Sequence, residues 1–214
     1  SNYNSLLTKQ FTNQMIRFEK SFGKHKVNAL GAYEYTRHFY ESTSAEGRGI
    51  QPGREILDVT TGIKSIGGYK DAIATQSALF NANYDYDNRY MGQVSYRMDE
   101  SSCFGKNNRM GHFFTVSGGW NIQNETFFES LRESVNQLKV RVSYGSLGNT
   151  PGAYYGHYPL YSSMMYNDEV AYFPSQMGNA DLSWEKCYTT NIGIDARFFD
   201  RFGVTIDLYN KNTS

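Results

Sequence analysis

Apolar and polar residues alternate with a period of two along much of this chain. In the stretch 78–86, alanine, phenylalanine and tyrosine occupy every second position, and mostly asparagine and aspartate lie between them. Successive side chains of a β-strand point to opposite faces, so this pattern predicts strands with one apolar and one polar face. Eight stretches of about ten residues show it, the first more weakly than the rest: 16–22, 27–35, 78–86, 90–98, 114–122, 138–144, 188–198 and 202–208.

The links between the predicted strands alternate in length. Short turns are expected at 23–25, 87–88 and 200–201. Long links are expected at 41–75, 100–109 and 147–184. One further link, 123–136, joins an odd strand to an even one and is nevertheless longer than a turn. Its Phe127, Phe128, Leu131 and Val135 have helical spacing, which predicts a short helix over 125–135. An up-and-down sheet with these links has its tight turns at one end and its long loops at the other.

This sorting of links is typical of outer-membrane β-barrels, which have tight periplasmic turns and long outer loops. A tilted strand of about 9–11 residues crosses a bilayer, so the predicted strands are long enough. Aromatic residues near the tight turns fit an interfacial girdle: Tyr84, Tyr86, Tyr90, Trp120, Phe198 and Phe202. The pattern predicts an all-β chain, an up-and-down antiparallel sheet of about eight strands in a transmembrane barrel. A soluble β-sandwich is the alternative, although its loops do not usually sort by length.

Composition and charge narrow the function classes. The chain has 214 residues with 21 basic and 21 acidic side chains, and this zero net charge argues against nucleic-acid binding. Aromatic residues make up 16% of the chain, which suits half-buried strands and argues against disorder. The longest apolar run, 170–173, is too short for a membrane-spanning helix. The stretch 1–11 lacks the apolar core of a signal peptide, so we expect a protein that is not exported or an internal piece of a longer chain.

Five groups of motifs occur in a fixed order along the chain. They are ALFNANY at 78–84 with DNRY at 87–90, RMDESSCFGKNNR at 97–109 with SGGW at 117–120, LKVRVSYGSLGN at 138–149, GNADLSWEK at 178–186 with NIGID at 191–195, and YNKNTS at 209–214. In this order and spacing, from about Phe11 to the end, they resemble the SusC/RagA family of TonB-dependent outer-membrane transporters of Bacteroidetes. Glu100 stands where the family usually has a turn glycine, and Cys103 where a basic residue is common. Both departures fall at a loop tip.

The resemblance implies a role for the chain within a larger protein. The family barrel has about 22 strands around a plugged lumen, so about eight strands would form an arc of its wall. Residues 1–214 would then be part of the barrel, without the signal peptide, N-terminal domain, TonB-contacting segment, plug and final strands. The family takes up a glycan, or sometimes a peptide, with a SusD-like lipoprotein, in a process energised through TonB. The implied surroundings are outer-membrane lipid.

Two sets of residues are candidates for binding. Aromatic faces stack on sugar rings, and the link 147–184 carries Tyr154, Tyr155, His157, Tyr158, Tyr161, Tyr166, Tyr172 and Phe173. In the family, outer loops meet the substrate and the lipoprotein, but these rings could instead pack on one another to order the loop. The polar strand faces would line the lumen and meet the plug, or form a solvated face: Asn81, Asn83, Asp85, Gln93, Arg97, Asp99, Lys139, Arg141, Asn191, Asp195 and Arg197.

The sequence gives no indication of catalysis. The four histidines are scattered without metal-ligand spacing, and no nucleophile elbow, P-loop or dinucleotide-binding motif occurs. We therefore expect no catalytic residue, metal or cofactor, and no enzyme. A disulfide between Cys103 and Cys187 is disfavoured, because a whole strand lies between theirs. The competing functions are a soluble carbohydrate-binding β-domain and an outer-membrane barrel enzyme.

Overall fold

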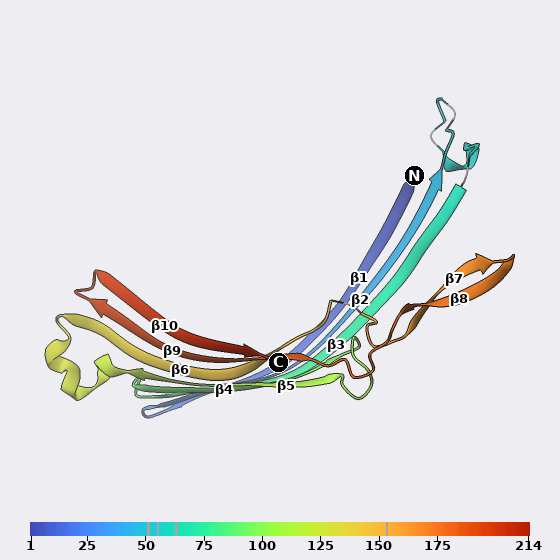
Figure 1. Cartoon of the computed structure of the whole chain (residues 1–214). Coiled ribbons are helices and arrows are strands. Elements are labelled where there is room, and N and C mark those ends of the chain that lie inside the picture. Colours follow the sequence, from blue (N-terminus) through green and yellow to red (C-terminus); the bar gives the residue numbers. More distant parts are fainter. Residues whose placement is uncertain (51, 55, 63, 153) are drawn as a thin grey trace.

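The computed structural model describes residues 1–50, 52–54, 56–62, 64–152 and 154–214, which form one curved antiparallel sheet and a separate hairpin (Figure 1). The eight strands lie in the order β1-β2-β3-β4-β5-β6-β9-β10. Their bounds are Asn2–Phe22, His25–Gly47, Lys64–Tyr86, Tyr90–Ser101, Met110–Asn121, Val135–Asn149, Glu185–Phe198 and Phe202–Thr213. β1 and β10 are the two edges, so the described sheet is open. The predicted all-β, up-and-down sheet of about eight strands is confirmed.

The tight turns gather at one end of the sheet, on the left of Figure 1, and the long links lie towards the right. Asp87 and Asn88 both have positive φ, as do Phe199 and Asp200 in the turn between β9 and β10. Two successive positive φ angles are typical of two-residue hairpin turns, whose twist matches that of the strands. In the turn between β1 and β2, Gly23 has a φ of 58°.

The link expected at 41–75 is mostly strand, which corrects the prediction. β2 and β3 pair from His25–Tyr86 outward to Gly47–Lys64, and only 48–63 joins them, with a 3-10 turn at Leu57–Val59. β1 is likewise longer than expected: it begins at Asn2, whereas the sequence predicted a start at residue 16. The outer halves of these strands carry many polar and glycine residues, so they do not alternate between apolar and polar positions. Backbone hydrogen bonds between the strands hold them in the sheet. Residues 51, 55, 63 and 153 of the predicted links lie outside the described residues.

The short helix expected over 125–135 is present as a 3-10 helix, η3 at Thr126–Leu131, and a second 3-10 helix, η2 at Ile122–Asn124, precedes it. Glu125 separates them with an extended backbone, φ −79° and ψ 149°. Its carboxylate accepts a hydrogen bond from Trp120 Nε1 at 3.0 Å, and this side-chain contact accompanies the break between the two helices. Among the described residues, no helix has the length and apolarity needed to span a membrane.

The link 147–184 contains a hairpin that the alternation did not indicate. β7 (Leu160–Tyr166) pairs with β8 (Glu169–Gln176) to form the second, two-stranded sheet. Asn167 and Asp168 form its turn with positive φ angles of 51° and 63°. Figure 1 shows this hairpin projecting away from the main sheet at the long-link end.

One face of the main sheet is apolar and exposed. The strand register places Val94 of β4 between Ala82 and Val116, and the next apolar row joins Phe80, Tyr96 and Phe114. Phe80 is 50% exposed, and Val94 and Val116 are each 49% exposed. The buried apolar side chains of the described residues are four: Cys103, Phe104, Phe113 and Phe128. The main sheet therefore has no second protein layer over its apolar face within the described residues.

Candidate functional site

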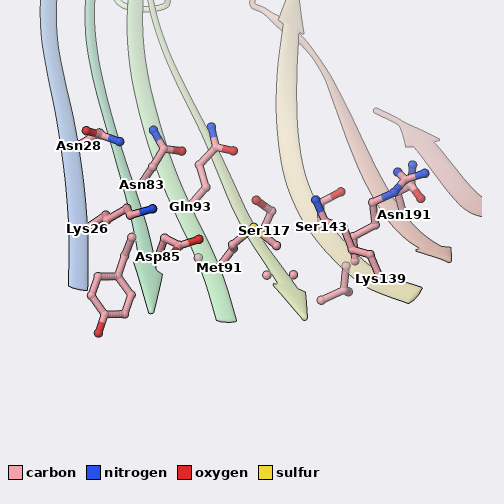
Figure 2. A pocket seen from close by; sticks show the side chains of 16 residues that line it. Lys26, Asn28, Asn83, Asp85, Met91, Gln93, Ser117, Lys139, Ser143 and Asn191 are labelled. Atoms are coloured by element: carbon pink, nitrogen blue, oxygen red, sulfur yellow. The ribbon is translucent and has the colours of Figure 1, made fainter. Parts of the chain in front are cut away.

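The opposite face of the sheet carries a hollow of about 410 Å³ bounded by strands β2 to β6 and β9 (Figure 2). One row of amide and hydroxyl side chains runs across all six strands through this hollow, and we call it the polar row. Each member is the direct cross-strand partner of the next: Asn28, Asn83, Gln93, Ser117, Ser143 and Asn191. The Oδ1 atom of Asn191 is buried and has no hydrogen-bond partner among the described residues. The row thus offers donors and acceptors to whatever lies against this face.

Charged side chains flank the polar row on the tight-turn side. Arg141 of β6 contacts Asp195 of β9 at 3.0 Å and Asp207 of β10 at 2.8 Å. Gly193 makes room for this cluster, since a Cβ there would lie 2.6 Å from the guanidinium carbon of Arg141. Thr205 donates a further hydrogen bond to Asp195 at 3.1 Å. The cluster joins three strands through one guanidinium, and its two carboxylates outweigh that single positive charge.

The residues predicted for the lumen side share the face that holds the polar row. They are Asn81, Asn83, Arg97, Arg141, Asn191 and Asp195, distributed over β3, β4, β6 and β9. Asn83 donates to Asn81 at 2.7 Å, and Arg97 donates to the neighbouring Asp99 at the same distance. Among these six residues, the one pair in contact across strands is Arg141 with Asp195, and Arg97 bonds across strands to Ser77 instead. The alternation identified the face, but the cross-strand row is visible only once the register is known.

The aromatic residues predicted in the link 147–184 divide into two groups. Tyr155 and His157 hold the base of the link: Tyr155 Oη accepts a hydrogen bond from the Ala72 amide at 2.9 Å, and His157 is only 8% exposed. The other six have exposed rings: Tyr154, Tyr158, Tyr161, Tyr166, Tyr172 and Phe173. Within this set, the one close ring pair in the described residues is His157 with Tyr158, at 4.0 Å between centroids. Four of the exposed rings lie on the β7–β8 hairpin.

A small aromatic core anchors this link to the loop between β4 and β5, and sequence reasoning missed it. The Trp184 ring lies 4.9 Å from Phe104 and 5.5 Å from Phe113, between centroids. Its Nε1 donates to the Arg109 carbonyl oxygen at 2.9 Å. Phe113 fills the space above Gly148, where a Cβ would meet its ring at 2.0 Å. The signal was present only as two short motifs, CFG and SWEK, whose contact cannot be seen in the sequence.

A second aromatic cluster lies at the tight-turn end of the sheet. The rings of Tyr90 and Trp120 stack at 6.3 Å, and Tyr86 continues the row at 6.4 Å from Tyr90. Hydrogen bonds from Tyr90 and Trp120 lower the pKa of Glu125, with the nearby Arg89 cation lowering it further. A hydrogen bond from Lys24 lowers the pKa of Asp87 in the same way. The aromatic row lies where the sequence predicted an interfacial girdle.

The described residues show little that points to metal or nucleophile chemistry. No group of three or more histidine, cysteine, aspartate or glutamate side chains among them is placed to hold a metal ion. Cys103 is buried, Cys187 is partly buried, and both are free thiols. The chemistry available in the described hollows is therefore hydrogen bonding, charge and aromatic stacking.

Comparison with known proteins places these features in context. No protein-family model matches the chain. TonB-dependent receptor P39 of Formosa agariphila is 32% identical over 206 residues, which cover 92% of this chain and 20% of the receptor. TonB-dependent receptor SusC of Bacteroides thetaiotaomicron is 29% identical over 214 residues, which cover 94% of this chain and 21% of that receptor. The chain therefore spans about a fifth of the length of the curated relatives it matches.

Solved structures agree with the sequence relatives. The RagAB peptide transporter matches with a TM-score of 0.87 at 27% identity, over 99% of this chain and 24% of the other. The RagAB peptide importer in its closed-closed state gives a TM-score of 0.88 at 28% identity, over the same shares. These matches confirm the predicted resemblance to the SusC/RagA family and the predicted outer-membrane localisation. The relatives carry the names of receptors and transporters.

Proposed function

We propose, from this likeness to TonB-dependent receptors, that residues 1–214 form an arc of the wall of an outer-membrane nutrient transporter. One observation carries the proposal: a single sheet has an exposed apolar face and, on its other side, the polar row. Val94 and Val116 on the apolar face are each 49% exposed, and adjacent positions Gln93 and Ser117 belong to the polar row. Such a sheet is stable when lipid covers one face and water or polar protein meets the other.

The rest of the transporter would lie elsewhere in the parent chain. We place the plug, the N-terminal domain, the TonB-contacting segment and the remaining strands outside these residues. The polar row and the Arg141 cluster would then face the lumen and the plug, whose backbone and side chains can hydrogen-bond to amides and hydroxyls. Movement of the plug, driven through TonB, would open the path for substrate. In this account the chain itself supplies wall, lumen surface and outer loops, and has no catalytic role.

The β7–β8 hairpin would meet the partner or the substrate at the cell surface. Its Tyr161, Tyr166 and Tyr172 are 64%, 72% and 74% exposed, and Met165 is 63% exposed. Exposed aromatic and methionine side chains are typical of protein–protein contact surfaces. We propose a SusD-like lipoprotein as the partner and a glycan as the substrate, with a peptide as the second candidate. The likeness to RagAB, a peptide transporter, supports the second candidate.

A soluble carbohydrate-binding domain is the competing function. It requires the apolar strand faces to pack against each other, as in a β-sandwich. Ile192, Ile194 and Ile206 on the apolar face are 49%, 42% and 56% exposed, so no second layer covers them in the described structure. This observation favours the transporter wall.

Lipid contact can be tested at two adjacent positions. The variants Val116→Cys and Ser117→Cys of the full-length parent, with native cysteines replaced, are labelled with a small fluorophore and reconstituted into vesicles of brominated lipid. Bromine quenches only fluorophores that meet the acyl chains, so we expect strong quenching at 116 and little at 117. Equal quenching at both positions would contradict a wall with one lipid face.

A further inference from the structure

A second hollow, of about 490 Å³, lies at the long-link end of the sheet, apart from the polar row. It forms where the loop between β4 and β5 meets two parts of the link 147–184. Lys106, Asn107 and Arg109 come from the first loop, His157 and Tyr158 from the link, and Ala180 from the segment that returns to β9. The backbone N–H of Asn179 donates a hydrogen bond to the Gly156 carbonyl oxygen at 3.1 Å, and this bond holds the two parts of the link together.

The charge in this hollow is unbalanced. Its lining contains Lys106 and Arg109 but no aspartate or glutamate. Within the described ranges, neither cation has an acidic side chain within ion-pair distance, whereas Arg97 and Arg141 both do. Arg109 Nε donates to the Phe104 carbonyl at 3.3 Å, and the Arg109 side chain also lines a neighbouring hollow that contains Glu100. A concave surface lined by positive charges without balancing negative ones attracts anions.

His157 adds a second, independent feature. Its Nδ1 lies 2.9 Å from the Cys103 carbonyl oxygen, and because a carbonyl only accepts, Nδ1 must carry the hydrogen. In the neutral ring, Nε2 is then a hydrogen-bond acceptor. Nε2 is buried and lacks a hydrogen-bond partner among the residues that the structure describes. Buried polar atoms are normally paired, so Nε2 needs a donor that the described residues do not supply, and a ligand hydroxyl in the hollow can be that donor.

Tyr158 determines what kind of anion fits. It lines the hollow with a ring that is 50% exposed, and the His157 ring supports it at 4.0 Å between centroids. Aromatic faces of this kind stack on the apolar side of sugar rings. A bare inorganic anion would meet the cations but leave this face and most of the volume unused.

We infer that this hollow binds an acidic sugar unit, with its carboxylate at Lys106 and Arg109, a hydroxyl donating to His157 Nε2, and its ring against Tyr158. The inference rests on the proposed function, because it places the site at the outer mouth of the transporter. It narrows the substrate class to glycans that contain uronate or a similar acidic unit. A neutral glycan would leave both cations without a counter-charge.

The test measures binding to the purified full-length parent in detergent by isothermal titration. The ligands are a galacturonate trimer and the neutral galactose trimer of equal length. We expect the acidic trimer to bind at least about tenfold more tightly, and Lys106→Gln to remove most of that difference, since charge-assisted bonds are the strong ones. Lys106 is exposed, so its replacement leaves the fold intact. Arg201→Gln removes one positive charge at the tight-turn end and serves as the matched control, with no change expected.

Several outcomes would overturn the inference. These are equal affinity for the acidic and neutral trimers, or unchanged binding of the acidic trimer to Lys106→Gln. Inorganic phosphate that competes as well as the acidic trimer would indicate a phosphate site instead. Binding of lipopolysaccharide without binding of the acidic trimer would assign the cations to membrane lipid. The lipid-quenching test at positions 116 and 117 is independent of all these results, so failure here is distinguishable from failure of the proposed function.

Discussion

Replacement of Val94 by arginine tests whether the apolar face of the sheet meets lipid. Val94 lies in β4, four residues from Tyr90 in the aromatic row at the tight-turn end. With a rise of about 3.3 Å per residue and a strand tilt of about 45°, it lies roughly 9 Å further into the bilayer than that row. A lipid-facing arginine costs about 2–4 kcal/mol at the midplane and less near the interface, so we expect about 2–3 kcal/mol here.

Gln93→Arg is the matched control, because the same charge then stands at the same depth on the opposite face. Gln93 is exposed in the polar row between Asn83 and Ser117. An arginine there meets polar groups, and we expect a change of about 1 kcal/mol or less.

The assay is urea unfolding of the full-length parent in lipid vesicles. Since each 1.4 kcal/mol is a factor of ten, Val94→Arg should lower the folding equilibrium constant about 30- to 150-fold, and Gln93→Arg about fivefold at most. Equal losses in the two variants, or a larger loss for Gln93→Arg, would refute the assignment of the apolar face to lipid.

Contacts at the two ends of the sheet give further expected outcomes. Hydrogen bonding from Tyr90 lowers the pKa of Glu125, so the ionised Glu125 carboxylate stabilises the fold at neutral pH. That stabilisation is lost as the pH falls below about 4 and the carboxylate takes up a proton. Glu125→Gln should therefore weaken the acid-induced fall in melting temperature. Gly148→Val drives a side chain into the Phe113 ring, so we expect a loss of about 1–3 kcal/mol and faster proteolysis within 147–184. Cys103, which is 0% exposed, should react with a thiol reagent only after unfolding.

Controls for these outcomes lie in the same chain. Gly152 has open space around its Cβ position, so Gly152→Val should leave proteolysis unchanged. Cys187 is partly buried and should react in the folded protein faster than Cys103. Equal proteolysis of the two glycine variants would contradict the packing of Phe113 against Gly148. Immediate labelling of Cys103 would contradict the docked loop.

The two-faced part of the sheet could be predicted from the sequence because one apolar face and one polar face require strict alternation. Every second residue of a spanning strand must be apolar, and the stretches 78–86 and 90–98 show this directly. The outer parts of β2 and β3, up to the Gly47–Lys64 pair, meet no such requirement, so alternation does not distinguish them from a loop. Only backbone pairing defines them, and backbone pairing leaves little trace in side-chain type.

The candidate sites were less predictable, because they depend on contacts between distant segments. Alternation assigned Asn83 and Asn191 to the polar face, but their membership of one row follows from the register of six strands. In the sequence, His157 is one of eight ring-bearing residues in the link 147–184, and its contact with the Cys103 carbonyl joins positions 54 apart in the chain. Neither feature has a local signal.

Accessibility of the two ends of the sheet in intact cells tests the central claim most directly. Single cysteines replace Ser163 in the β7–β8 hairpin and Arg201 in the tight turn after β9, both of which are exposed, in the full-length parent without native cysteines. A membrane-impermeant thiol reagent should label position 163 in intact cells and position 201 only after lysis. Labelling of both positions only after lysis, or of 201 alone in intact cells, would contradict a transmembrane wall with its long links outside.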